Sequence, residues 1–259
     1  MNPNIKIKNL IKTLAKETNE AKKSESMKQY LTLMSKFHNY SYKNQLIIFS
    51  QNPKATRIAG IKTWQSLNRK VKKGEKSIKI LAPIIKDEEI LNFRPVSVFD
   101  ISQTEGQELK DIEIAIKGNT HQDLLNKLIR LTNKENIQVE FKDLKEGLFG
   151  YCNNNNIVIN KNHEINTQVN TLVHELAHYI LHKNKELTKI TKEVQAEAVA
   201  FVVLNYFNLE TKSFNYLAIY DANEEIILEN LKVISETSKG IINQILNNNS
   251  IYCSKVKFK

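Results

Sequence analysis

Two histidines four residues apart constrain the fold of this sequence more than any other feature. His174 and His178 enclose Glu175 in an HExxH motif within the run TLVHELAHYILH (171–182), whose other positions are largely apolar. On a helix, residues four apart lie one above the other, so both imidazoles project from one face. The spacing therefore predicts a helix that presents two ligands to one tetrahedral ion, with Glu175 beside them as the base that activates water.

A third protein ligand is expected from the helix that follows, because a catalytic zinc has three protein ligands and one open position. The run EVQAEAVA begins at Glu193, 15 residues after His178, which leaves room for the chain to reverse. Glu193 and Glu197 share a face of this predicted helix. In the gluzincin pattern the first acid binds the metal and the second holds a histidine ligand through its other ring nitrogen. We assign the two acids in that order, and the reverse order stays open.

The ion is expected to be a single Zn²⁺, and the motif does not exclude Mn²⁺. His182, one turn beyond His178, is expected to be an exposed residue at the helix end and not a ligand. The extended HExxHxxGxxH motif is absent, because Leu181 occupies the position of its glycine.

The second half of the sequence predicts a mainly helical domain with a small antiparallel sheet. A helix with the apolar stripe Leu124, Leu125, Leu128 and Leu131 is followed by a strand over 137–141 and by a hairpin. The hairpin strands, 148–152 and 157–160, flank the turn-forming run 153–156. Helices are expected at about 164–182, 190–208 and 223–247, before a polar tail.

The first half predicts an α+β domain. Helical spacing of apolar residues marks two segments between residues 5 and 50: Ile5, Leu10, Ile11 and Leu14, then Tyr30, Leu31, Met34 and Phe37. A short helix passes through Trp64 and Leu67, and strands are expected over 78–84 and 94–101 with a surface loop over 86–92. We place the domain boundary near 106–118, which gives domains of 1–106 and 119–259.

Charge is distributed unevenly between these halves. The net charge is +10, and residues 1–110 hold 21 Lys+Arg against 10 Asp+Glu, whereas the remainder holds 17 against 18. A bias of the whole genome would act on both halves alike, so the asymmetry indicates that the first half meets a polyanion.

Basic and aromatic side chains gather in one part of the first half, as they do in proteins that bind single-stranded nucleic acid. The candidate DNA-binding residues are Tyr42, Arg57, Lys62, Trp64, Arg69, Lys70, Lys72, Lys73 and Lys76. Two other interpretations stay open at this point: Trp64 can be a core residue, and the lysine-rich turn can be a solvated surface.

Four separated blocks resemble the N-terminal domain of ArdC-type antirestriction proteins: NQLIIFSQNP (44–53), AGIKTWQ (59–65), VKKGEK (71–76) and FRPVSVFD (93–100). The resemblance covers about residues 30–106 and implies a module that binds single-stranded DNA. Asn68 departs from the family, which usually has glycine before the basic turn. HELAH (174–178) and EVQAE (193–197) are similar to the metallopeptidase-like domain of the same family and, more distantly, to ImmA/IrrE peptidases.

Three functions follow from these features. The resemblance implies an antirestriction protein of a mobile element that protects incoming DNA, with a zinc-dependent peptidase cleaving a protein or peptide substrate. A non-catalytic protein that binds single-stranded DNA and has a structural metal is the first alternative, and a peptidase that cleaves a repressor is the second. No run approaches the roughly 18 apolar residues of a membrane-spanning helix, so we expect a cytoplasmic protein without a membrane partner. The two cysteines receive no role, and the oligomeric state is left open.

Overall fold

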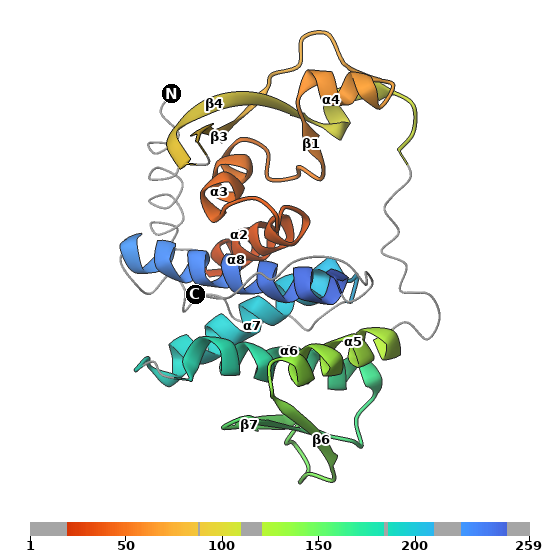
Figure 1. Cartoon of the computed structure of the whole chain (residues 1–259), viewed down its shortest axis with the longest axis vertical. Helices are drawn as coiled ribbons and strands as arrows, with labels where there is room; N and C mark the ends of the chain where they lie inside the picture. The colour runs from red at the N-terminus through yellow and green to blue at the C-terminus, as the bar shows by residue number, and fades with distance from the viewer. Residues whose placement is uncertain (1–19, 88, 110–120, 184–185, 210–223, 248–259) are drawn as a thin grey trace. The chain divides into compact units, whose positions relative to one another are not determined.

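Two units make up the chain in the computed structural model, which describes residues 20–87, 89–109, 121–183, 186–209 and 224–247 (Figure 1). One unit comprises 1–111 and 219–232, and the other comprises 112–218 and 233–259. The predicted helix over Ile5–Leu14, the polar tail from 248 and most of the predicted domain boundary lie outside the described residues. The α+β class expected from the sequence is confirmed, because both units combine helices with small sheets.

The N-terminal unit packs helices against a three-stranded antiparallel sheet. Its described elements are α2 (Glu20–Lys36), α3 (Tyr42–Gln51), β1 (Ile58–Ala59), α4 (Ile61–Ser66), β2 (Arg69–Val71), β3 (Ile78–Lys86), β4 (Glu89–Asp100), η1 (Ile101–Gln103) and β5 (Thr104–Gly106). The sheet order is β1-β4-β3, and β2 pairs with β5 separately. The basic turn between β2 and β3 contains Gly74 at φ 91°, a conformation that favours glycine.

Helix α3 covers the outer edge of β3 with two side-chain amides. Asn44 donates to the Leu81 carbonyl and accepts from the Leu81 N–H, both at 2.9 Å. Gln51 makes the same pair of bonds with Lys79, at 3.0 and 3.1 Å. The amides satisfy backbone groups that would otherwise be unpaired at a sheet edge. The NQLIIFSQNP block thus supplies both the apolar face of α3 and its polar contacts with the sheet.

The hairpin of β3 and β4 is longer than the sequence predicts. The expected surface loop over 86–92 is wrong, because Ile85 pairs with Ile90 and Lys86 with Glu89. A bulge between Ile84 and Ile85 shifts the register by one residue. The strands continue to the turn because isoleucines on both of them favour extended backbone, although an acidic cluster follows.

The C-terminal unit places helices on a small mixed sheet. Its described elements are α5 (His121–Lys134), β6 (Gln138–Lys142), β7 (Gly150–Asn153), β8 (Asn156–Asn160), α6 (Ile165–His182) and α7 (Lys189–Tyr206). The division between the units falls inside a further helix, α8 (Glu224–Asn247). The predicted helices are confirmed within a few residues. The predicted antiparallel hairpin is present as β7 and β8, and β6 joins β8 in parallel.

Strand β7 is an edge of this sheet, whose order is β6-β8-β7, and it lies close against α6. A Cβ added at Gly150 would come within 2.6 Å of the Thr171 side chain and 2.7 Å of the Val158 carbonyl. Glycine at this position therefore allows the edge strand to approach the HExxH helix. No helix in the described part of the chain is long and apolar enough to cross a membrane.

Candidate metal centre

The two motif histidines converge on one point. Helix α6 buries one apolar face, which directs both histidines toward the other face. The buried residues include Val169, Leu172, Val173, Leu176 and Ala177. The Nε2 atoms of His174 and His178 are 3.0 Å apart, and both rings are only partly exposed. Two imidazole nitrogens this close together have the arrangement of two ligands that bind the same ion.

Glu193, from the start of α7, completes a triangle of donor atoms. Its Oε2 lies 3.5 Å from the Nε2 of His174 and 3.5 Å from the Nε2 of His178. Metal–ligand bonds of about 2.0–2.1 Å at tetrahedral angles separate donor atoms by roughly 3.3 Å. The observed spacings of 3.0 and 3.5 Å match that separation. Among the described residues, these three form the one group of His, Cys, Asp and Glu side chains that could hold a metal ion.

Glu197, one turn further along α7, lies on the other side of His174. Its Oε1 is 3.4 Å from the Nδ1 of His174. The contact is long: Nδ1 is buried and the geometry falls short of a hydrogen bond. Burial, together with the nearby carboxylate of Glu193, raises the pKa of Glu197. The structure thus places Glu193 toward the converging Nε2 atoms and Glu197 toward Nδ1.

Glu175 lies beside the histidine pair on α6 and interacts with Cys152 of the edge strand β7. Burial raises its pKa to about 7, and the negative charge of Glu193 adds to the increase. The backbone N–H of Cys152 on β7 donates to its carboxylate, which opposes the increase. The thiol of Cys152 is itself shifted by burial and by Glu175 to a pKa of about 11, so it stays protonated at neutral pH.

Burial keeps the histidines in the neutral form that binds metals. The pKa of His174 is lowered to about 4, first by burial and then by the neighbouring His178. The pKa of His178 is also lowered, mainly by burial, although Glu193 opposes the shift. Both rings therefore offer an unprotonated nitrogen at neutral pH.

His182 has a different environment from the one expected. The prediction of an exposed residue at the helix end is wrong, because His182 is half-buried and contacts both α6 and α7. Its Nδ1 lies 3.0 Å from the Nδ1 of His178, and its Nε2 lies 2.9 Å from the Oε1 of Gln195. The sequence carried one signal of this arrangement: His174, His178 and His182 repeat every four residues on one helix.

The candidate DNA-binding residues of the N-terminal unit differ in their environments. Trp64 is 2% exposed and donates from Nε1 to the Phe99 carbonyl at 3.0 Å, so its prediction as a base-stacking residue is wrong. It is a core residue, as the alternative interpretation has it. The guanidinium of Arg69 donates hydrogen bonds to the segment Thr104–Gln107, including two to Thr104 at 2.8 and 3.0 Å.

Two of the candidate lysines have partners within the unit, and the others face solvent. Lys70 pairs with Glu105 at 3.1 Å, and Lys72 donates to the Ser102 carbonyl at 2.9 Å. The remaining lysines, Lys62, Lys73 and Lys76, are exposed, while Tyr42 and Arg57 are half-buried.

The fold and the site define a class of protein: an α+β N-terminal domain joined to a domain of metallopeptidase-like fold. Residues 6–120 match the model of the N-terminal domain of the anti-restriction factor ArdC, and residues 129–232 match the IrrE N-terminal-like domain. The chain therefore combines an N-terminal domain of the ArdC family with an IrrE-like domain, which is the two-domain architecture expected from the sequence.

Solved structures show the same fold. The Mn(II)-bound crystal structure of the antirestriction protein ArdC from plasmid R388 aligns with a TM-score of 0.54 at 15% identity, over 83% of this chain and 86% of that one. The metal-free structure of that protein aligns with a TM-score of 0.50 at 15% identity, over 81% and 85% of the two chains. An uncharacterized protein of Bacillus anthracis is 29% identical over 99 residues, which are 38% of this chain but only 17% of the relative.

Proposed function

We propose that this protein is an antirestriction factor of a mobile element that binds single-stranded DNA through its N-terminal unit and hydrolyses a peptide bond at a metal centre in its C-terminal unit. The observation that carries the proposal is the triangle of His174, His178 and Glu193, which has the dimensions of a divalent-ion site in a chain with an N-terminal domain of the ArdC family. The R388 relative was crystallised with Mn(II), and the ligand set suits Zn²⁺ equally.

His174, His178 and Glu193 would hold the ion, and Glu197 would orient His174 through Nδ1. When bound, such an ion supplies Lewis-acid chemistry: it polarises a carbonyl and increases the acidity of water. Three protein ligands leave one position for the reactants, which is the arrangement of a catalytic and not of a structural zinc site.

Glu175 would be the general base. Its carboxylate lies beside the ligands, and the Cys152 N–H orients it from β7. A pKa of about 7 is suitable for a group that takes a proton from water and returns it to the leaving amine. An extended peptide would add to the sheet beside β7, because β7 is the edge strand of the sheet and packs against the helix that carries this base.

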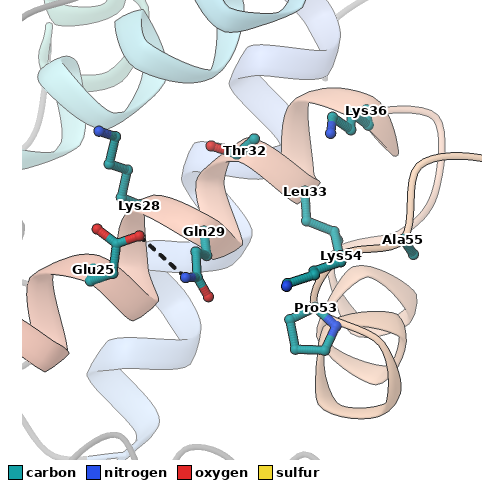
Figure 2. Close-up of a pocket in the computed structure, with 9 residues that line it drawn as sticks. All are labelled: Glu25, Lys28, Gln29, Thr32, Leu33, Lys36, Pro53, Lys54 and Ala55. Atoms are coloured by element: carbon teal, nitrogen blue, oxygen red, sulfur yellow. Dashed lines mark hydrogen bonds between the residues drawn. The ribbon is translucent and has the colours of Figure 1, made fainter.

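The N-terminal unit supports the binding of single-stranded DNA through charge. Lys73 and Lys76 are exposed in the β2–β3 turn, and Lys62 is exposed on α4. A separate hollow of about 330 Å³ lies between α2 and the segment after α3, and three of its nine lining residues are lysines: Lys28, Lys36 and Lys54 (Figure 2). Glu25, its one acid, is engaged by Gln29 at 3.2 Å. Both surfaces suit phosphates.

The deciding experiment replaces Glu175 by Gln, which keeps the shape of the side chain and both histidines. Protection of transferred DNA from restriction is measured together with the metal content of the purified protein. Glu186→Gln, the same substitution at an exposed acid of the same unit, is the matched control. The enzymatic proposal expects Glu175→Gln to abolish protection while the metal stays bound. Full protection by a metal-loaded Glu175→Gln protein would leave a non-catalytic DNA-binding protein with a structural metal.

A further inference from the structure

We infer that Gln195 and His182 are positioning residues that fix the tautomer of His178, so that its Nε2 lone pair faces the metal. This inference rests on the proposed metal centre and adds to it a second device for orienting a ligand. It concerns two residues to which the HExxH pattern gives no role.

A chain of hydrogen bonds connects the three side chains. The Oε1 of Gln195 lies 2.9 Å from the Nε2 of His182, and the Nδ1 of His182 lies 3.0 Å from the Nδ1 of His178. The Nε2 of His178 then lies 3.0 Å from the Nε2 of His174, on the side of Glu193. Gln195 is 6% exposed, so its amide is held in a protected position between the helices.

The order of donors along this chain follows from its first member. A carbonyl oxygen only accepts, so Oε1 of Gln195 requires a proton on the Nε2 of His182. In a neutral imidazole the other nitrogen, Nδ1, is then an acceptor, and it accepts a hydrogen bond from the Nδ1–H of His178. The Nε2 of His178 is left without a proton, as a metal ligand must be.

The opposite orientation of the amide reverses every step. An NH₂ group would donate to the Nε2 of His182, so the ring proton of His182 would lie on its Nδ1. The Nδ1 of His178 would then be an acceptor, and the proton of His178 would lie on the ligating Nε2. The amide orientation in the structure is thus the one compatible with a metal ligand. The Nδ1 of His174 instead lies 3.4 Å from the carboxylate of Glu197.

The test compares two variants at position 195, one that keeps a hydrogen-bond acceptor and one that removes it. Gln195→Glu keeps an acceptor toward His182, whereas Gln195→Met keeps the length of the side chain and removes the acceptor. Zn²⁺ affinity of the full chain is measured by competition with a chelator, and thermal unfolding of the metal-free protein reports on the fold. Removing a residue that orients a metal ligand typically weakens affinity by about 10- to 100-fold. We expect a loss of that size for Gln195→Met and for His182→Phe, and little loss for Gln195→Glu.

Two further measurements separate orientation from packing. The double variant Gln195→Met with His182→Phe should lose no more Zn²⁺ affinity than His182→Phe alone, because both residues act through one contact. Long-range ¹H–¹⁵N spectra of the metal-free wild-type protein should show His178 protonated at Nδ1, and Gln195→Met should remove that preference. A proton on the Nε2 of His178 in the wild type would overturn the inference. Wild-type Zn²⁺ affinity in both Gln195→Met and His182→Phe would also overturn it. A wild-type protein that binds no Zn²⁺ or Mn²⁺ would instead refute the proposed metal centre, and the spectra would still decide the tautomer.

Discussion

The backbone N–H of Cys152 on the edge strand β7 donates a hydrogen bond to the carboxylate of Glu175 on α6. This bond connects the strand on which a peptide would pair to the base that would activate the attacking water. It stabilises the ionised carboxylate, yet burial and the charge of Glu193 outweigh it and leave the pKa at about 7. The site therefore holds a half-buried carboxylate whose ionisation opposes folding.

The first prediction concerns the pH dependence of this cost in the metal-free protein. Because the pKa of Glu175 is raised in the folded state, the cost is fully present above pH 7 and disappears as the pH falls from 7 to the ordinary value of 4.5. Glu175→Gln removes the charge and keeps an acceptor for Cys152. Allowing for solvent screening at a half-buried site, we expect it to stabilise the protein by about 2 kcal/mol at pH 8. The gain should vanish at pH 4.5, and urea unfolding at both pH values measures it. An equal gain at both would contradict the raised pKa.

The second prediction separates the two acids of α7. Glu193→Gln should lower metal affinity by orders of magnitude, because it replaces the proposed anionic ligand near both Nε2 atoms. Glu197→Gln changes the partner of His174 Nδ1 and should cost about 10- to 100-fold. Isothermal titration with Zn²⁺ gives both values. The reverse ranking would exchange the roles of the two acids.

The third prediction is that metal binding persists below the pH at which an exposed histidine site fails. A solvent-exposed imidazole is protonated near pH 6.5 and then rejects the ion. Burial lowers the pKa of His174 to about 4 and lowers that of His178 as well, so their protonation competes with the metal only at lower pH. Affinity measured from pH 7 to pH 5 should fall less than it does for an exposed peptide that contains HELAH. Equal falls would show that the histidines are not protected from protonation.

The helical half of the fold was accessible to sequence reasoning because each of its signals is local. The HExxH spacing and the EVQAE run fix two helices and the side of each that carries ligands, and the asparagine-rich run before them predicts the hairpin. The contacts of His182 depend on how α7 packs against α6, and no spacing within one helix encodes that. Gln195 was missed for the same reason: between two acids it looks like an ordinary polar residue, and only its burial reveals its role.

The N-terminal unit was predicted less well, for reasons that concern particular side chains. Trp64 sits in a lysine-rich stretch that is typical of a binding surface, but α4 turns it inward onto the Phe99 carbonyl. Asn68 replaces the usual glycine and still adopts φ 55°, a conformation that asparagine tolerates better than most residues. The amide contacts of Asn44 and Gln51 with β3 join residues 28 or more positions apart, beyond the range of a local pattern.

The fourth prediction follows from the burial of Trp64. Trp64→Phe keeps an aromatic ring in the core and removes the donor to the Phe99 carbonyl, which leaves a buried acceptor without this partner. The lost hydrogen bond and the smaller ring should destabilise the protein by about 1–3 kcal/mol. Affinity for single-stranded DNA, measured below the melting temperature, should stay within about twofold. A large loss of affinity in a protein that remains folded would restore Trp64 as a stacking residue.

The last prediction tests the basic surface around the β2–β3 turn. Lys73→Glu with Lys76→Glu reverses two exposed charges and should weaken binding to a single-stranded oligonucleotide strongly at low salt. Fluorescence anisotropy over a series of salt concentrations should also show a smaller dependence on salt, because fewer counterions are released per complex. Lys145→Glu with Lys189→Glu changes the net charge equally on exposed lysines of the C-terminal unit and should change neither quantity by much. Equal effects of the two double variants would mean that total charge, and not this turn, attracts the DNA.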